Sequence, residues 1–268
     1  MRKISVDTAR LPVMLTELRL PTVARLWPSI AETSDKEGWP AARFLSALVE
    51  HELAERAQRR TARHAQQARL PIGKSFESFD FAAVPMVSKA RFLALAEGDA
   101  WIEKGQNILI FGPPGVGKTH LAAALAYSLI DNGFRALFMR TTDLVQKMQA
   151  ARQELALPAL IERLDKYHLL ILDDISYVQK SQAETSVLFE LISARYERRS
   201  ILITANQPFG AWDSIFPDKA MTVAAIDRLV HHAVIVEMNV ESFRRRSAMT
   251  RNANPQIAEE VKVEGPPA

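Results

Sequence analysis

Short apolar runs separated by longer stretches of helical spacing fill the chain after residue 100. We expect five of these runs to form strands, because they are short and apolar throughout: 107–111, 136–139, 168–172, 201–204 and 234–237. Strand and helix therefore alternate, which predicts an α/β fold with a parallel sheet covered by helices on both faces. Ser181 and Glu184 have the spacing of a capping box, which predicts a helix after the third strand.

The first 70 residues have a different, all-helical pattern. Apolar residues lie near helical spacing between 11 and 31, where Pro21 and Pro28 predict a division into two short helices. Residues 40–69 contain no glycine, and no proline after the first residue. They predict one long helix with an apolar first half and a basic second half. The apolar positions are Phe44, Leu45, Leu48 and Leu53.

These patterns predict four parts. Residues 1–70 form a small helical domain, 71–82 form a connector with three phenylalanines, 83–251 form the α/β domain, and 252–268 form a disordered tail. No apolar run approaches the roughly 20 residues of a membrane-spanning helix, and the first residues lack the apolar core of an export signal. The absence of cysteine excludes disulfides and thiolate metal sites. We therefore expect a cytoplasmic protein that does not contact a membrane.

The glycine-rich stretch GPPGVGKT, residues 112–119, follows the first predicted strand and precedes a predicted helix from Thr119 to Ile130. This spacing and context are typical of a phosphate-binding loop, in which backbone N–H groups and a helix N-terminus face the phosphates. Lys118 is expected to reach the β- and γ-phosphates, and Thr119 to place its hydroxyl on Mg²⁺. The residues of the loop are Gly112, Pro113, Pro114, Gly115, Val116, Gly117, Lys118 and Thr119.

Polar side chains follow the third and fourth predicted strands, at the edge where open α/β sheets bind ligands. We expect Asp173 to hold Mg²⁺ and Asp174 to orient or deprotonate the attacking water. Asn206 either holds that water and senses the γ-phosphate or simply begins a turn. Arg228 either pairs with its neighbour Asp227 or projects into the site of an adjoining subunit.

The adjacent pair His231 and His232 is a possible metal site by residue type alone. Neighbouring residues on a helix point in different directions, so we predict that the two histidines are not ligands.

Together these residues resemble the AAA+ ATPases of the DnaC/IstB group, and within it most of all IstB, the ATP-binding helper of insertion-sequence transposition. The resemblance spans roughly residues 76–246. The matching stretches are GPPGVGKTHLAAALA, TTDLV at 141–145, LLILDD, ITANQP and DRLVHHA at 227–233. The phosphate loop is generic, but its combination with DRLVHHA is more restrictive.

The resemblance implies an AAA+ P-loop fold with strand order 5-1-4-3-2 and ATP between the subunits of a ring, spiral or filament. It assigns Lys118, Thr119 and the following His120 to the ATP site, and Arg228 to the arginine-finger position. Two departures matter. Asp174 stands where many AAA+ proteins have glutamate, and Val240 and Phe243 replace the glycine and tyrosine of a late Gly-Glu-Ser-Tyr-Arg motif. The phosphate sensor implied there is Arg244, with Arg245 and Arg246 as alternatives.

The net charge is only +3, but the basic residues are unevenly placed. Arginines on the long N-terminal helix recur at i, i+4 and i+7, so one face can neutralise DNA phosphates without reading sequence. The alternative is a solvated helix whose arginines pair with Glu52 and Glu55. The predicted DNA-contacting residues are Arg56, Arg59, Arg60 and Arg63.

The function that the sequence favours is that of a Mg-dependent, DNA-stimulated ATPase that assembles on duplex DNA and recruits or activates a transposase. ATP hydrolysis would drive disassembly. One alternative is a DnaC-like loader of a replicative helicase. The other, of a different class, is a nucleotide-gated DNA scaffold with negligible hydrolysis.

Overall fold

A computed structural model of the chain describes residues 8–175, 181–208, 210, 212 and 219–243. The chain forms two compact units, Met1–Arg63 and His64–Ala268. Among the described helices, none is long and apolar enough to cross a membrane.

The first unit is helical, as the spacing of its apolar residues predicts. It begins with the 3₁₀ turn η1 (Thr8–Arg10), continues with α1 (Leu11–Glu17) and α2 (Pro21–Glu37), and enters α3 (Ala41–Ala68). Leu15, Val23 and Leu48 form its small buried core.

The prediction that Pro28 divides the second helix is wrong, because Pro28 lies inside α2. A proline in a helix interior removes one backbone hydrogen bond. The helix tolerates this loss because Val23, Trp27 and Ile30 pack along one face against α1 and α3. Pro21 does act as predicted, since it occupies the first turn of α2, where the missing N–H costs little.

A buried carboxylate joins α3 to the N-terminus of α2. Glu52 accepts the backbone N–H groups of Thr22, at 2.9 Å, and Val23, at 3.1 Å. Arg56 Nε donates to the same carboxylate at 2.8 Å. Burial alone raises the pKa of Glu52, but the hydrogen bonds from Arg56, Val23 and Thr22 outweigh it, so its pKa is lowered.

The second unit is the predicted α/β domain. Its strands form one parallel sheet in the order β2-β3-β4-β1-β5, which confirms the order that the resemblance implies. The strands are β1 (Ile108–Phe111), β2 (Ala136–Arg140), β3 (Leu169–Asp173), β4 (Ser200–Ala205) and β5 (Val234–Glu237). The helices are α4 (Lys89–Glu97), α5 (Asp99–Glu103), α6 (Lys118–Asp131), α7 (Thr141–Gln153), α8 (Leu157–Asp165), α9 (Gln182–Arg195) and α10 (Lys219–Val230).

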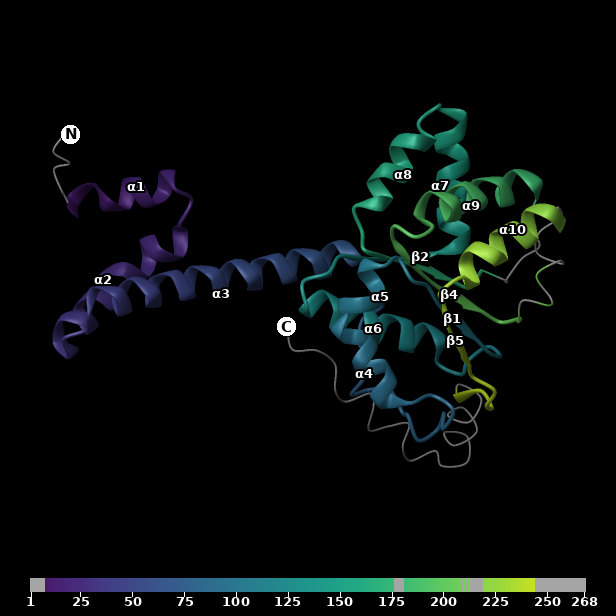
Figure 1. The fold of residues 1–268 in the computed structure, drawn as a ribbon, viewed down its shortest axis with the longest axis horizontal. Helices are drawn as coiled ribbons and strands as arrows, with labels where there is room; N and C mark the ends of the chain where they lie inside the picture. Colours follow the sequence, from purple (N-terminus) through teal and green to yellow (C-terminus); the bar gives the residue numbers. More distant parts are fainter. Residues whose placement is uncertain (1–7, 176–180, 209, 211, 213–218, 244–268) are drawn as a thin grey trace, which may run out of the picture. The chain divides into compact units, whose positions relative to one another are not determined.

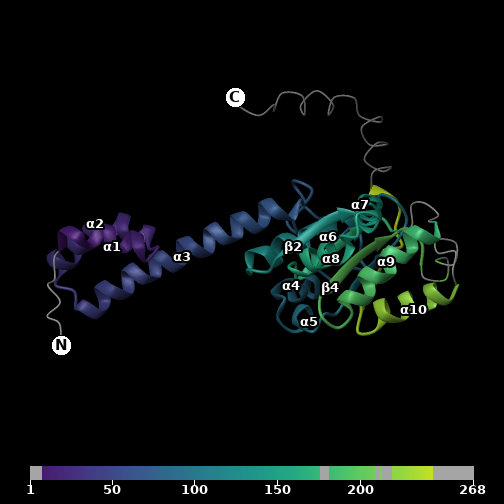
Figure 2. The same cartoon turned by 90° about the horizontal axis from the view of Figure 1, so that it is seen from above.

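The helices cover both faces of the sheet (Figures 1 and 2). Alternate strand residues point to opposite faces: Ile108 and Ile110 join a core with α4, α5 and α6. Leu109 and Phe111 join the other core, with α7, α8, α9 and α10. The central strands β1, β3 and β4 are therefore buried on both faces, which explains why they are mainly apolar, whereas the edge strand β5 has exposed positions. The capping box predicted at Ser181 and Glu184 is present at the start of α9.

The segment predicted as a connector, 71–82, contributes to the core of the second unit. Phe76 and Phe79 are buried there, and Phe79 packs edge-on against Phe81 with ring centres 4.8 Å apart. Burial of these aromatic rings fixes the segment against α6.

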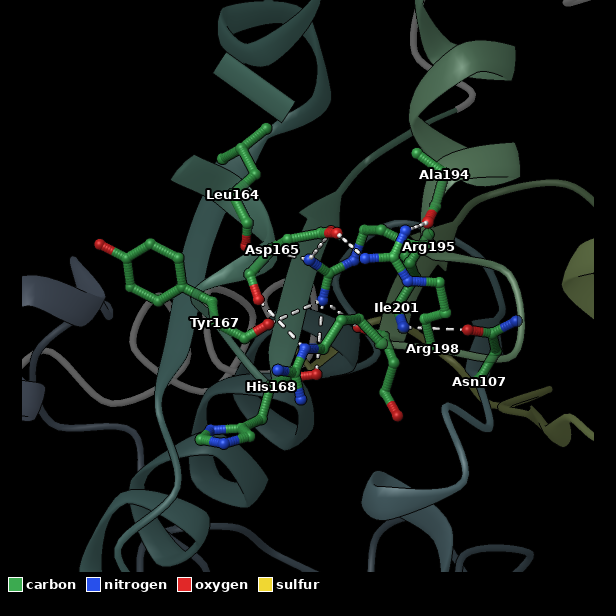
Figure 3. A network of polar contacts seen from close by, with 11 residues as sticks. Asn107, Leu164, Asp165, Tyr167, His168, Ala194, Arg195, Arg198 and Ile201 are labelled. Atoms are coloured by element: carbon green, nitrogen blue, oxygen red, sulfur yellow. Dashed lines mark hydrogen bonds and ion pairs between the residues drawn. The ribbon is translucent and has the colours of Figure 1, made fainter. Parts of the chain in front are cut away.

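A buried arginine joins the segment between α8 and β3 to the start of β4 (Figure 3). The Arg195 guanidinium donates to the carbonyl oxygens of Leu164, at 3.0 Å, and Ser200, at 2.9 Å. Its side chain is fully buried, and this burial lowers its pKa to about 10. Asn107 acts similarly at the start of β1, because its side chain accepts Ile201 N–H at 2.9 Å and donates to Leu229 O at 3.1 Å.

Glu52→Gln is expected to loosen the first unit. The change removes a charged acceptor from two buried N–H groups, which typically costs about 1–3 kcal/mol. Hydrogen exchange at the first turn of α2 should accelerate about tenfold or more. The wild type should lose the same protection as the pH falls through the lowered pKa of Glu52, since only the ionised carboxylate holds both N–H groups and Arg56.

The exposed Glu50 on the same helix supplies the matched control, Glu50→Gln. Equal exchange rates in the two variants would contradict the role given to Glu52.

Candidate nucleotide-binding site

The loop between β1 and α6 has the backbone shape of a phosphate-binding loop. Gly115 and Gly117 have positive φ angles of 85° and 103°, which place the residues before α6 in the left-handed region. Gly112 has φ 153°, and a Cβ there would lie 2.4 Å from the carbonyl oxygen of Met238. Glycine is therefore required at Gly112 by close backbone approach as well as by conformation.

Lys118 closes the loop on itself. Its Nζ donates to the carbonyl oxygens of Gly112, at 2.7 Å, and Pro113, at 2.9 Å. A third bond of 2.8 Å reaches Oδ1 of Asn206 at the end of β4. The side chain is buried, so this charge depends on the oxygen atoms around it.

The carboxylate of Asp173 lies beside two hydroxyls. Thr119 Oγ1 donates to Asp173 Oδ1 at 2.9 Å, and Thr204 Oγ1 donates to the same oxygen at 2.7 Å. Asp173 ends β3 and Thr204 lies on β4, while Thr119 is in the first turn of α6. Two strands and one helix thus bring these oxygen atoms together.

Asp174 and Asn206 form the second polar pair. Asn206 Nδ2 donates to Asp174 Oδ1 at 2.9 Å, and Asp174 N–H donates to Thr204 Oγ1 at 2.9 Å. Asp174 has a φ of 59°, a left-handed conformation that aspartate adopts more readily than most residues. The amide of Asn206 therefore bridges the ammonium of Lys118 and the carboxylate of Asp174.

A cavity of about 720 Å³ opens beside these residues. The phosphate loop and Asp173 line one part of it. The other part is lined by Ser78 and Phe79 of the predicted connector, by Ala83 and Val84 just after it, and by Val240 and Phe243 of the late motif. The density of phenylalanines in a short segment is the signal that could have indicated burial beside the site.

His120 fastens the connector to the loop. Its Nε2 lies 3.0 Å from Ser75 O and 3.1 Å from Ser78 Oγ, and its ring packs edge-on against Phe79. Burial lowers the pKa of His120, and nearby Lys74 lowers it further, against the opposing effect of Ser75 O. A neutral imidazole at neutral pH therefore lines the cavity.

The residues of this site fit a nucleoside triphosphate with Mg²⁺. The loop supplies backbone curvature, a buried ammonium and the N-terminus of a helix, all of which favour phosphate. Asp173 and Thr119 supply a carboxylate and a hydroxyl, the hard oxygen ligands that Mg²⁺ prefers. The apolar residues beside them suit a flat aromatic base.

Arg228 lies near the amino ends of the strands, whereas this cavity lies near their carboxyl ends. The end of α10 that carries it is attached to the start of β1 through Asn107 and Leu229 O, whereas the phosphate loop follows the end of β1. A strand of this length separates the two ends by roughly 13 Å. Arg228 Nη1 donates to Ala224 O at 2.8 Å, and its guanidinium lies 5.1 Å from the Phe189 ring centre. The structure thus gives Arg228 partners other than Asp227.

The four arginines predicted to contact DNA divide into two pairs. Arg56 and Arg59 form ion pairs with Glu52, at 2.8 Å, and Glu55, at 3.2 Å, so the alternative of a salt-bridged helix holds for these two. Arg60 and Arg63 are exposed. The predicted phosphate sensors Arg244, Arg245 and Arg246 and the tail at 252–268 lie outside the described residues.

Comparison with known proteins agrees with this geometry. The chain is 69% identical over 245 residues to a protein of Sinorhizobium fredii described as an insertion sequence ATP-binding protein, covering 91% of this chain and 82% of the relative. It is 35% identical over 260 residues to the ATP-binding protein described for insertion sequence IS21 of Pseudomonas aeruginosa, covering 95% and 98%.

The fold is similar to that of AMPPCP-bound DnaA from Aquifex aeolicus, with a TM-score of 0.52 and 18% identity, over 63% of this chain and 51% of that one. The second unit thus has an AAA+ P-loop fold. The model of the family "IstB-like ATP binding protein" matches residues 13–251, and the chain belongs to this family.

Proposed function

We propose that the chain binds and hydrolyses ATP in this cavity and serves as an assembly factor of insertion-sequence transposition on duplex DNA. The observation that carries the proposal is the continuous polar network from Lys118 through Asn206 to Asp174. It places a phosphate-binding cation and a carboxylate suited to activating water at one edge of the sheet. The family and its insertion-sequence relatives supply the biological setting.

In this proposal the triphosphate lies against the backbone N–H groups of the phosphate loop. Lys118 exchanges its carbonyl partners for oxygens of the β- and γ-phosphates. Thr119 and Asp173 would hold Mg²⁺, which when bound would neutralise charge on the phosphate oxygens. Asp174 orients the attacking water and accepts its proton, and Asn206 fixes the carboxylate through its 2.9 Å bond.

Arg228 acts on the ATP of an adjoining copy of the chain. It lies near the amino ends of the strands, and the phosphate loop follows the carboxyl end of β1, so Arg228 cannot reach its own nucleotide. ATP therefore lies between subunits and promotes self-assembly into a ring, spiral or filament. Turnover then depends on assembly, which gives ATP hydrolysis a means to drive disassembly.

Duplex DNA contacts the first unit through the exposed arginines of α3. Arg60 and Arg63 carry most of this contact, because Arg56 and Arg59 are occupied by glutamates of the same helix. Contacts of this kind neutralise phosphates and do not read bases, which suits an element with many targets. The assembled protein then recruits or activates the transposase.

A DnaC-like helicase loader remains the alternative, and the insertion-sequence relatives favour the transposition role. A scaffold that binds nucleotide without hydrolysis is disfavoured, because it has no need of an Asp174 carboxylate fixed beside Lys118 through Asn206.

Asp174→Asn is expected to separate ATP binding from hydrolysis. The amide cannot accept the proton of the attacking water, so single-turnover hydrolysis should fall about 10²–10⁴-fold. Binding of a fluorescent ATP analogue should change by less than about threefold, because Lys118 and Thr119 are untouched. Asp131→Asn, an exposed site at the end of α6, is the control. Hydrolysis at the wild-type rate would remove Asp174 from the mechanism.

Arg228→Ala is expected to lower DNA-stimulated turnover by about 10³-fold or more while ATP affinity of the dilute chain is retained. Mixing this variant with Asp174→Asn should restore turnover above either variant alone, because some interfaces then combine an intact finger with an intact ATP site. Arg163→Ala, at an exposed position of α8, is the control. A mixture no more active than its components would contradict action between subunits.

The double change Arg60→Ala, Arg63→Ala is expected to weaken duplex binding equally for unrelated sequences. The slope of log affinity against log salt should fall by about two, since each lost phosphate contact contributes about 0.9. Lys36→Ala removes a cation of the same unit that is paired with Glu32 at 2.7 Å, and should leave the slope unchanged. An unchanged slope in the double variant would place DNA elsewhere.

A further inference from the structure

The prediction that His231 and His232 are not metal ligands assumed that both lie on a helix, but both residues lie beyond the end of α10. They occupy a turn in which His232 has a φ of 60°. The two imidazole rings lie with their centres 3.9 Å apart. The helical geometry on which the prediction depended is therefore absent at these two residues.

Glu197 completes a group of three possible metal ligands with this pair. One ligand atom of each residue lies within 4.8 Å of the others, and all three side chains are exposed. His231 Nδ1 lies 3.5 Å from Glu197 Oε1. Tetrahedral zinc with bonds of 2.0–2.1 Å needs ligand atoms about 3.4 Å apart, so small side-chain rotations close the group around one ion.

The backbone on both sides of the group is held by one short segment before β1. Gly105 packs so closely under the turn carrying Glu197 that a Cβ would lie 2.8 Å from its carbonyl carbon. Asn107 holds the end of α10 through Leu229 O at 3.1 Å, and its own carbonyl accepts Val234 N–H at 2.9 Å. The ligands therefore come from two turns that share a fixed support, as a preorganised site requires.

Tyr196 reaches the same ring nitrogen, since its hydroxyl lies 2.6 Å from His231 Nδ1. An ion bound to His231 through Nε2 leaves this hydrogen bond in place, and such a partner fixes the ring of a metal-binding histidine. The chemistry of the group also differs from that of the nucleotide site. Two imidazoles and one carboxylate favour zinc, nickel or cobalt, whereas the hydroxyl and carboxylate of Thr119 and Asp173 favour Mg²⁺.

We propose that Glu197, His231 and His232 bind one divalent transition-metal ion of the zinc class at the edge of the sheet opposite the nucleotide cavity. The fourth position is taken by water. This site is separate from the Mg²⁺ ligands and does not depend on the proposed function.

The test is a zinc titration of the untagged full chain without nucleotide or Mg²⁺, followed by calorimetry, with Co²⁺ absorption reporting the coordination geometry. The wild type should bind one equivalent that His232→Ala and His231→Ala each lose. Glu197→Gln should weaken that equivalent about tenfold or more, because it removes the charged ligand. Co²⁺ should give the visible bands of a four-coordinate ion in the wild type and not in the two histidine variants.

The exposed His51 belongs to no such group among the described residues, so His51→Ala is the matched control and should keep full zinc binding. Unchanged thermal unfolding of the metal-free variants excludes a folding defect as the cause of any loss. Zinc binding that survives both histidine changes, or a wild type that binds no more than the double variant His231→Ala, His232→Ala, would overturn the proposal.

Discussion

The hydroxyl of Thr204 is the contact on which the nucleotide site depends. It donates to Asp173 Oδ1 at 2.7 Å and accepts the backbone N–H of Asp174 at 2.9 Å. A single oxygen atom thus positions two consecutive acidic residues, to which the proposed function gives different roles. The contact exists because β4 lies between β3 and β1, with Thr204 opposite Ile110 of β1. A slip of one residue would turn Thr204 into the other core and leave both carboxylates without this support.

The same sheet connects the residues at the carboxyl ends of its strands with those at the amino ends. At the end of β1 the chain turns into the phosphate loop, and at its start Asn107 holds β4, β5 and α10 together. The central strands β1, β3 and β4 are buried on both faces and leave little freedom for one end of the sheet to move without the other. In the proposed function, a carboxylate at one end and an arginine at the other serve two different nucleotide sites with fixed geometry. The left-handed Asp174 is a local cost, of order 1–3 kcal/mol, that this rigid sheet sustains.

Much of this architecture could be predicted from the sequence, because the central strands are buried on both faces and so are mainly apolar. The phosphate loop was also predictable, because a side chain at Gly112 would collide with the carbonyl oxygen of Met238 and only glycine fits there. The failures also have physical causes. Pro28 was misjudged because tertiary packing of Trp27 and Ile30 outweighs one lost hydrogen bond. The core partners of Phe76 and Phe79 are distant in the sequence, so the density of phenylalanines could indicate burial but not its place. The approach of His231 to His232 depends on a left-handed turn at His232, which the helical pattern of the preceding residues does not encode.

The hydrogen bonds that Lys118 makes within the chain affect how the site exchanges bound nucleotide. The ammonium already has three oxygen partners within the chain, two from the loop and one from Asn206. In the proposed function an incoming phosphate competes with these oxygens and does not rescue a bare buried charge. The departing product would likewise leave behind a loop that its own lysine holds in shape. Loading and unloading would then proceed as a swap of acceptors on one pivoting side chain, with no need to rebuild the surrounding backbone in each cycle.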